Sequence, residues 1–203
     1  SIVLLHLAGG SLLLLLILAA IANIILGAGL PTVGVYILLA TLVAPSLIQM
    51  NIAPMAAHMF ILYYGCLSMI TPPVAIAAFV AANLAGADPN RTGWTAMKIG
   101  WMLFVLPFLF VFRGTLLLQG HPVLIVIDVV LAIAGVWFVS AAVMGYAMRP
   151  LGVVNRLVYA VTGVFLFFPA DALIARHWIN LAGVGLAIAL FFWERAQRRA
   201  PRT

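Results

Sequence analysis

The chain has 203 residues, of which 67% are hydrophobic and 7% are charged. Water-soluble domains carry about 45–50% apolar and about 25% charged residues, so the composition excludes that class and indicates an all-α polytopic membrane protein. The net charge of +6 does not indicate nucleic-acid binding, because no basic stripe alternates with aromatic residues.

The first organising feature is the segment Gly27-Ala28-Gly29-Leu30-Pro31-Thr32, which separates the apolar runs 12–26 and 33–47. Each run has about 15 residues, whereas a helix needs about 20 to cross a bilayer. Backbone groups freed by Gly and Pro at membrane depth must be buried by protein or face water. We therefore predict a re-entrant helical hairpin over residues 12–47 that opens to the outer face. A plain turn between two full crossings is the alternative.

The next apolar stretch, residues 55–86, is interrupted by Ile70-Thr71-Pro72-Pro73. Two adjacent prolines remove two N–H donors and clash with the preceding turn, so the stretch predicts a broken transmembrane helix, 55–69 and 74–84. After a polar loop, a membrane helix is expected over residues 96–118, with a kink at Pro107. Residues 1–118 are then expected to form one domain, with the hairpin 12–47, the broken helix 55–86 and the helix 96–118.

Residues 119–203 form a C-terminal extension with about three transmembrane helices. These are expected over residues 123–148, 157–169 and 178–193, and Asp171, Arg176 and His177 would form a loop at the outer interface. The basic tail of Arg195, Arg198, Arg199 and Arg202 places the C-terminus in the cytoplasm by the positive-inside rule. On that topology four further basic residues also lie inside: Arg91, Lys98, Arg149 and Arg156.

A hairpin tip and a broken helix near mid-membrane can together bind an ion or a substrate, because their free carbonyls suit a bare cation such as Na⁺. Thr32 and Thr71 add hydroxyl oxygens beside the two breaks, Ser68 lies one turn before the second break, and Asn23 lies about one turn before the tip. The alternative is that Gly, Thr and Pro simply let helices pack closely.

Other polar residues have weaker claims on function. His58 stands in an apolar helix and is expected to be a packed, hydrogen-bonded histidine rather than a proton relay. Asp128 is the acid inside a predicted span, and snorkelling or pairing with Arg113 is favoured over a functional role. The single cysteine, Cys66, is expected to serve packing.

No set of residues typical of an enzyme is present: there is no metal-binding cluster, serine elbow or phosphate loop. We therefore expect a transporter, not an enzyme. The chain begins at Ser1, and we expect it to be a piece of a longer protein. A membrane-embedded enzyme whose catalytic residues lie in the missing N-terminal portion is the alternative function.

Several motifs resemble the large membrane subunit of tripartite ATP-independent periplasmic (TRAP) transporters, most closely the C-terminal portion of the fused TAXI-type permeases. Leu7-Ala8-Gly9-Gly10-Ser11 and Ile25-Leu26-Gly27-Ala28-Gly29-Leu30-Pro31-Thr32 are similar to the second hairpin of that subunit. Ala57-His58-Met59-Phe60 and Ser68-Met69-Ile70-Thr71-Pro72-Pro73-Val74-Ala75 are similar to the broken helix that follows it.

The resemblance implies one half of an elevator-type, Na⁺-driven importer (a symporter) in the bacterial inner membrane, with residues 1–118 as the C-terminal part of its transport domain. It implies two protein partners: a periplasmic substrate-binding protein, and the missing N-terminal half with its scaffold helices. Membrane lipid would surround the assembly, and the substrate would be a small organic anion, in most cases a carboxylate. By family pattern, the residues that bind Na⁺ or border the substrate are Gly27, Gly29, Pro31 and Thr32 at the tip and Thr71 and Pro72 at the break. Gly27, Thr32 and Thr71 are the implied Na⁺ ligands.

Overall fold

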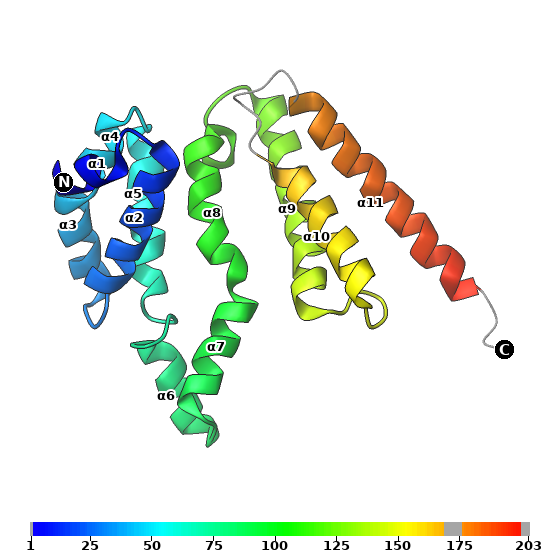
Figure 1. Cartoon of the computed structure of the whole chain (residues 1–203), viewed down its shortest axis with the longest axis horizontal. Coiled ribbons are helices and arrows are strands. Elements are labelled where there is room, and N and C mark those ends of the chain that lie inside the picture. Colours follow the sequence, from blue (N-terminus) through cyan, green and yellow to red (C-terminus); the bar gives the residue numbers. More distant parts are fainter. Residues whose placement is uncertain (1, 169–175, 200–203) are drawn as a thin grey trace. The chain divides into compact units, whose positions relative to one another are not determined.

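The computed structural model describes residues 2–168 and 176–199, and every regular element in these ranges is a helix (Figure 1). The expectation of an all-α fold is therefore confirmed. The chain divides into two compact units, Ser1–Leu117 and Leu118–Thr203.

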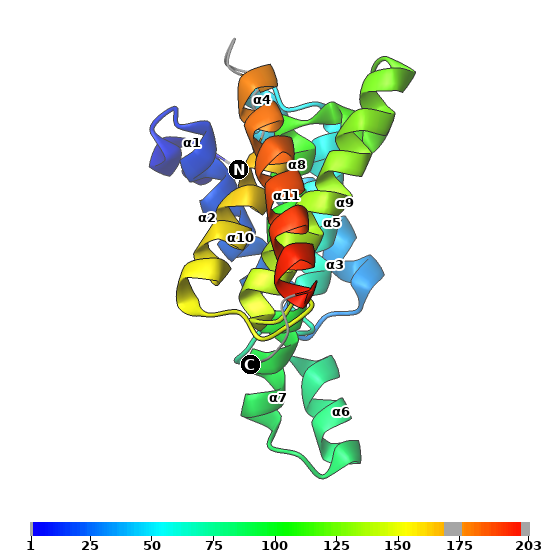
Figure 2. The ribbon, with the colours of Figure 1, turned by 90° about the vertical axis from the view of Figure 1, so that its right-hand side faces the viewer.

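The first unit contains a helical hairpin, α2 (Leu12–Leu26) and α3 (Thr32–Leu42), packed against α5 (Pro54–Leu67). Figures 1 and 2 both show α2 and α3 running in opposite directions, with their shared tip at the end of α5 remote from α1 (Ile2–Ala8) and α4 (Ala44–Gln49). The start of α2 and the end of α4 thus lie at the same end of this unit.

Local chemistry sets the ends of the two hairpin arms. Ser11 caps α2, because its Oγ accepts a hydrogen bond from the Leu14 N–H at 3.4 Å. Pro31 precedes α3 with φ −61° and ψ 146°, an extended conformation that the proline ring favours. The predicted arm 33–47 is not one helix: it is split into α3 and α4 at Val43. Pro45 lacks an N–H and its ring crowds the preceding turn, which accounts for the interruption at Val43, and the proline stands in the first turn of α4.

The core of the hairpin is apolar, and at one glycine the helices α3 and α5 approach each other closely. Leu16 of α2, Leu39 of α3 and Phe60 of α5 are all fully buried. A Cβ on Gly65 of α5 would lie 2.6 Å from Cγ1 of Val35. Gly65 therefore lets α3 approach α5 more closely than any larger residue would allow.

After a break, α6 (Ile76–Ala85) pairs with α7 (Pro89–Ile99), and α8 (Trp101–Phe112) and a 3₁₀ turn (Gly114–Leu117) follow. This differs from the predicted helix 96–118. The helix starts at Pro89 because Asp88 caps it, accepting the Arg91 N–H at 2.7 Å.

A bend of 41° lies between α7 and α8, at Gly100, and the kink at Pro107 inside α8 stays a prediction. The Tyr64 hydroxyl on α5 donates to the carbonyl of Phe104, in the turn that the proline ring crowds. This bond ties α5 to α8 beside Pro107, and α8 continues through the proline.

The second unit consists of α9 (Pro122–Met144), α10 (Val153–Phe167) and α11 (Arg176–Arg199). α9 and α10 touch through two glycines: a Cβ on Gly135 would lie 2.8 Å from the Gly163 carbonyl, and one on Gly163 would lie 2.6 Å from the Gly135 carbonyl. Asp171 lies outside the described residues, as do the side chains of Arg176, His177 and the basic tail.

Of the described helices, α9 is long and apolar enough to span a membrane by itself, and α7 with α8 meets the same criterion as a bent pair. Six shorter apolar helices of 10–17 residues accompany them. Short apolar helices joined at breaks suit the arms of a re-entrant hairpin and a broken span.

Candidate functional site

The tip of the α2–α3 hairpin lies directly on the C-terminal end of α5. A Cβ on Gly27 would lie 2.8 Å from the Asn23 carbonyl, 2.9 Å from the Gly65 carbonyl and 3.1 Å from Oγ of Ser68. Gly27 is buried. The close contact therefore requires glycine at this position, and it brings backbone oxygens of both α2 and α5 together.

Ser68 links the hairpin tip to α5. Its hydroxyl lies 2.9 Å from the Gly27 carbonyl and 2.7 Å from the Gly65 carbonyl, so one O–H is shared between two acceptors. Ser68 is itself 2% exposed. The residue predicted to lie one turn before the break is thus a bridge between the two broken elements.

Asn23, one turn before the tip, is completely buried, with 0% exposure. Neither its Oδ1 nor its Nδ2 has a hydrogen-bond partner among the described residues. A buried amide without partners costs free energy on the order of 1–3 kcal/mol, and native proteins retain such groups mainly where a ligand, ion or water binds. On α2, Asn23 shares its face with Gly27, which contacts α5.

The break between α5 and α6 spans residues 68–75. The Thr71 hydroxyl donates to the Leu67 carbonyl at 2.6 Å, and the Ala77 N–H reaches back to the Met69 carbonyl at 3.0 Å. Ala75 has φ +35°, a left-handed conformation that is uncommon for a residue with a side chain. These bonds hold the unwound link in one shape.

Pro72 contacts the neighbouring helix α7. A Cβ on Gly93 of α7 would lie 3.1 Å from Cγ of Pro72, so α7 packs against the break at this glycine. We therefore assign Pro72 a supporting contact with α7.

The described structure brings together only part of the predicted site. Asn23, Gly27 and Ser68 gather where α2 meets α5. Gly29, Pro31 and Thr32 are exposed at the tip, and Gly29 has φ +84°, which glycine adopts without strain. Among the described residues no hydrogen bond joins Thr32 to Thr71.

Sequence reasoning missed Gly65 and Gly93, the two glycines that allow close packing around the break. A glycine inside a helix was the available signal, because it lowers helix stability and usually has a packing reason. His58 was expected to be satisfied by packing, and its Nδ1 indeed lies 3.0 Å from the Tyr36 hydroxyl, which ties α3 to α5.

Two charged residues within apolar segments are also buried. Asp128 in α9 is 2% exposed, which rules out snorkelling of its carboxylate to solvent. Arg113, which ends α8, is 1% exposed. Cys66 is exposed on α5 and adjoins an apolar groove of about 350 Å³ beside the break.

The chemistry available where the tip meets α5 is that of neutral oxygen ligands. Carbonyls of Gly27 and Gly65, the Ser68 hydroxyl and the Asn23 amide lie in or beside it. In the part of the chain that the structure describes, no three His, Cys, Asp or Glu side chains gather. Neutral oxygens at this density suit a hard monovalent cation, for which a carboxylate is not needed.

Residues 1–125 match a family model described as "Tripartite ATP-independent periplasmic transporter, DctM component". The match includes the whole first unit, with the hairpin, the break and α8. Neither the curated proteins nor the solved structures contain a match to the chain.

Proposed function

The chain belongs to the family of DctM components of tripartite ATP-independent periplasmic transporters, and we propose that it couples Na⁺ entry to the import of a small organic anion. Membership makes it a multi-pass inner-membrane permease of a secondary transporter that works with a periplasmic binding protein. Membership also sets aside the alternative of a membrane-embedded enzyme.

The observation that carries the Na⁺ proposal is the buried, unpartnered amide of Asn23 beside the contact between Gly27 and Ser68. Na⁺ prefers several neutral oxygens, and carbonyls at helix breaks supply them. The Asn23 Oδ1 and carbonyls of the tip would serve as ligands, with Thr32 and Thr71 contributing hydroxyl oxygens when the tip and the break close around the ion.

Further details of the transporter belong to the same proposal. The permease is of the fused TAXI type, this chain is its C-terminal portion, and the movement is of the elevator type with the C-terminus in the cytoplasm. The substrate is a carboxylate, and the site is completed by the N-terminal half and its scaffold helices.

The test is binding-protein-dependent uptake by the complete transporter in vesicles, measured across a Na⁺ titration. Asn23→Leu keeps the size of the side chain and removes the amide oxygen, so the Na⁺ concentration for half-maximal uptake should rise about tenfold. Thr32→Val and Thr71→Val should each raise it by less, because each removes one neutral ligand.

Asn83→Leu is the matched control, because Asn83 is an exposed asparagine on α6. Its Na⁺ dependence should equal that of the wild type. If Asn23→Leu and both threonine variants insert normally and keep the wild-type Na⁺ dependence, the ion site lies elsewhere, and close helix packing is the correct interpretation of the two breaks.

A further inference from the structure

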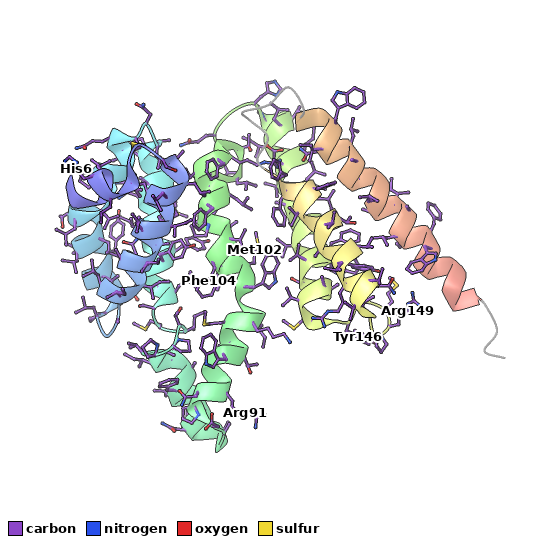
Figure 3. The ribbon with its side chains drawn as sticks, in the orientation of Figure 1. His6, Arg91, Met102, Phe104, Tyr146 and Arg149 are labelled. Carbon is purple, nitrogen blue, oxygen red and sulfur yellow. The ribbon has the colours of Figure 1, made fainter. Side chains whose placement is uncertain are left out.

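One face of α7 carries two cations and a tryptophan that the rest of its unit does not cover. Arg91, Thr95 and Lys98 are exposed, and Trp94 is 64% exposed. These positions are three, four and seven residues from Arg91, so they share one side of the helix. We call Arg91, Trp94, Thr95 and Lys98 the basic face. Figure 3 shows Arg91 near the turn that joins α6 to α7.

The orientation of the basic face is fixed by packing on the opposite side of α7. Gly93 is buried there, where a Cβ would lie 3.1 Å from Cγ of Pro72 and 3.4 Å from Cε1 of Phe79. Because α7 is held on α6 and the break through this glycine, it cannot turn its cations inward without losing that contact.

The basic face also lies at a change of polarity along the chain. α8 is apolar at every one of its twelve positions, whereas α7 carries Arg91 and Lys98 together with three threonine or asparagine side chains near them. The 41° bend at Gly100 separates the two helices. Cations and Trp next to the end of an apolar span are typical of the boundary between hydrocarbon and headgroups.

We propose that the basic face of α7 binds the phosphate headgroups of anionic phospholipids. Residues 76–100 contain one acid, Asp88. Its carboxylate accepts a hydrogen bond from the backbone N–H of Arg91 and so caps the helix. The two side-chain cations therefore exceed the acid charge, which complements an anionic membrane surface. A groove of about 430 Å³, lined by residues that include Asp88, Arg91 and Thr95, offers room beside the guanidinium for a headgroup, and the Asp88 carboxylate in its wall is bound to the end of α7 as the helix cap.

The test measures lipid binding by the purified full-length transporter in detergent, using phosphatidylglycerol and phosphatidylcholine as probes and native mass spectrometry as the readout. The wild type should retain phosphatidylglycerol in preference to phosphatidylcholine. Arg91→Gln with Lys98→Gln should weaken phosphatidylglycerol binding about 30-fold, since each cation near an anionic surface contributes about fivefold. Binding of phosphatidylcholine should not change.

The charge-conserving double variant, Arg91→Lys with Lys98→Arg, is the matched control and should keep at least a third of the wild-type affinity. Should the double glutamine variant fail to fold, a NaCl titration of the wild type replaces it: phosphatidylglycerol binding should weaken with salt and phosphatidylcholine binding should not. Inorganic phosphate, in about 10-fold excess over lipid, is the competitor that separates binding of a lipid headgroup from binding of a free anion. It should not displace phosphatidylglycerol, because it lacks the acyl chains that hold a lipid at the membrane surface.

Equal binding of both lipids by the wild type would overturn the proposal. So would a double glutamine variant that folds and binds phosphatidylglycerol as the wild type does, in which case the basic face meets an acidic protein surface or water. The readout does not involve Na⁺ or uptake, so this proposal and the proposed Na⁺ coupling fail or succeed separately.

Discussion

Replacing Gly27 with alanine tests whether the hairpin tip is docked on α5. The new Cβ would lie 2.8 and 2.9 Å from two backbone carbonyl oxygens, which cannot swing aside as a side chain can, and 3.1 Å from Oγ of Ser68. Overpacking of this kind costs about 1–3 kcal/mol. Moving the tip away would also break the hydrogen bond from Ser68, at about 1 kcal/mol. We therefore expect Gly27→Ala to destabilise the first unit by about 2–4 kcal/mol.

Gly34→Ala is the matched control, because Gly34 lies inside α3 and a Cβ there would meet nothing within 4 Å. Alanine in a helix interior is favoured over glycine by about 0.5–1 kcal/mol, so this variant should be as stable as the wild type or more so. The assay is thermal unfolding of the purified, full-length transporter, followed by uptake. A Gly27→Ala protein that unfolds at the same temperature as Gly34→Ala and transports normally would refute the docked tip.

Three further variants probe single contacts. Ser68→Ala should lower the unfolding free energy by about 1 kcal/mol, because one shared hydrogen bond to two buried carbonyls is lost, and thermal unfolding measures it. Tyr36→Phe should cost about 0.5–1.5 kcal/mol by leaving His58 without its partner, with no effect on the Na⁺ dependence of uptake. Gly163→Ala should disrupt the contact between α9 and α10, since its Cβ would lie 2.5 Å from Cγ2 of Val139, and cross-linking between the two helices would then fall.

Breaks in the helices were the part of the fold that sequence could predict, because proline and glycine act through the backbone and need no knowledge of neighbours. The tip after Leu26 and the break before Pro72 are examples. Pro45 also splits its helix, and it was overlooked because the apolar pattern continues across it. Pro107 shows the converse, because α8 continues through it. The presence of a proline therefore does not by itself show whether a helix ends there or continues.

The candidate site was predictable by residue type but not by role. Ser68 is predicted to bind an ion or the substrate, and its hydroxyl lies between two carbonyls that it bridges. The Thr71 hydroxyl, in the break, donates its hydrogen bond to the Leu67 carbonyl at the end of α5. Local bonds of this kind compete with ligand binding for every threonine near a helix end, and composition does not show which bond wins. The unpartnered state of Asn23 becomes visible only when all of its neighbours are placed.

The glycine contact between α9 and α10 bears on how the second unit is made. α9 is long and apolar enough to enter a bilayer by itself, whereas α10 has 15 residues and falls short of that length. Backbones that touch at Gly135 and Gly163 give the shorter helix a surface to dock on as soon as it leaves the translocon. The order of synthesis, with the self-sufficient helix emerging first, is therefore also the order in which membrane insertion of this pair can proceed.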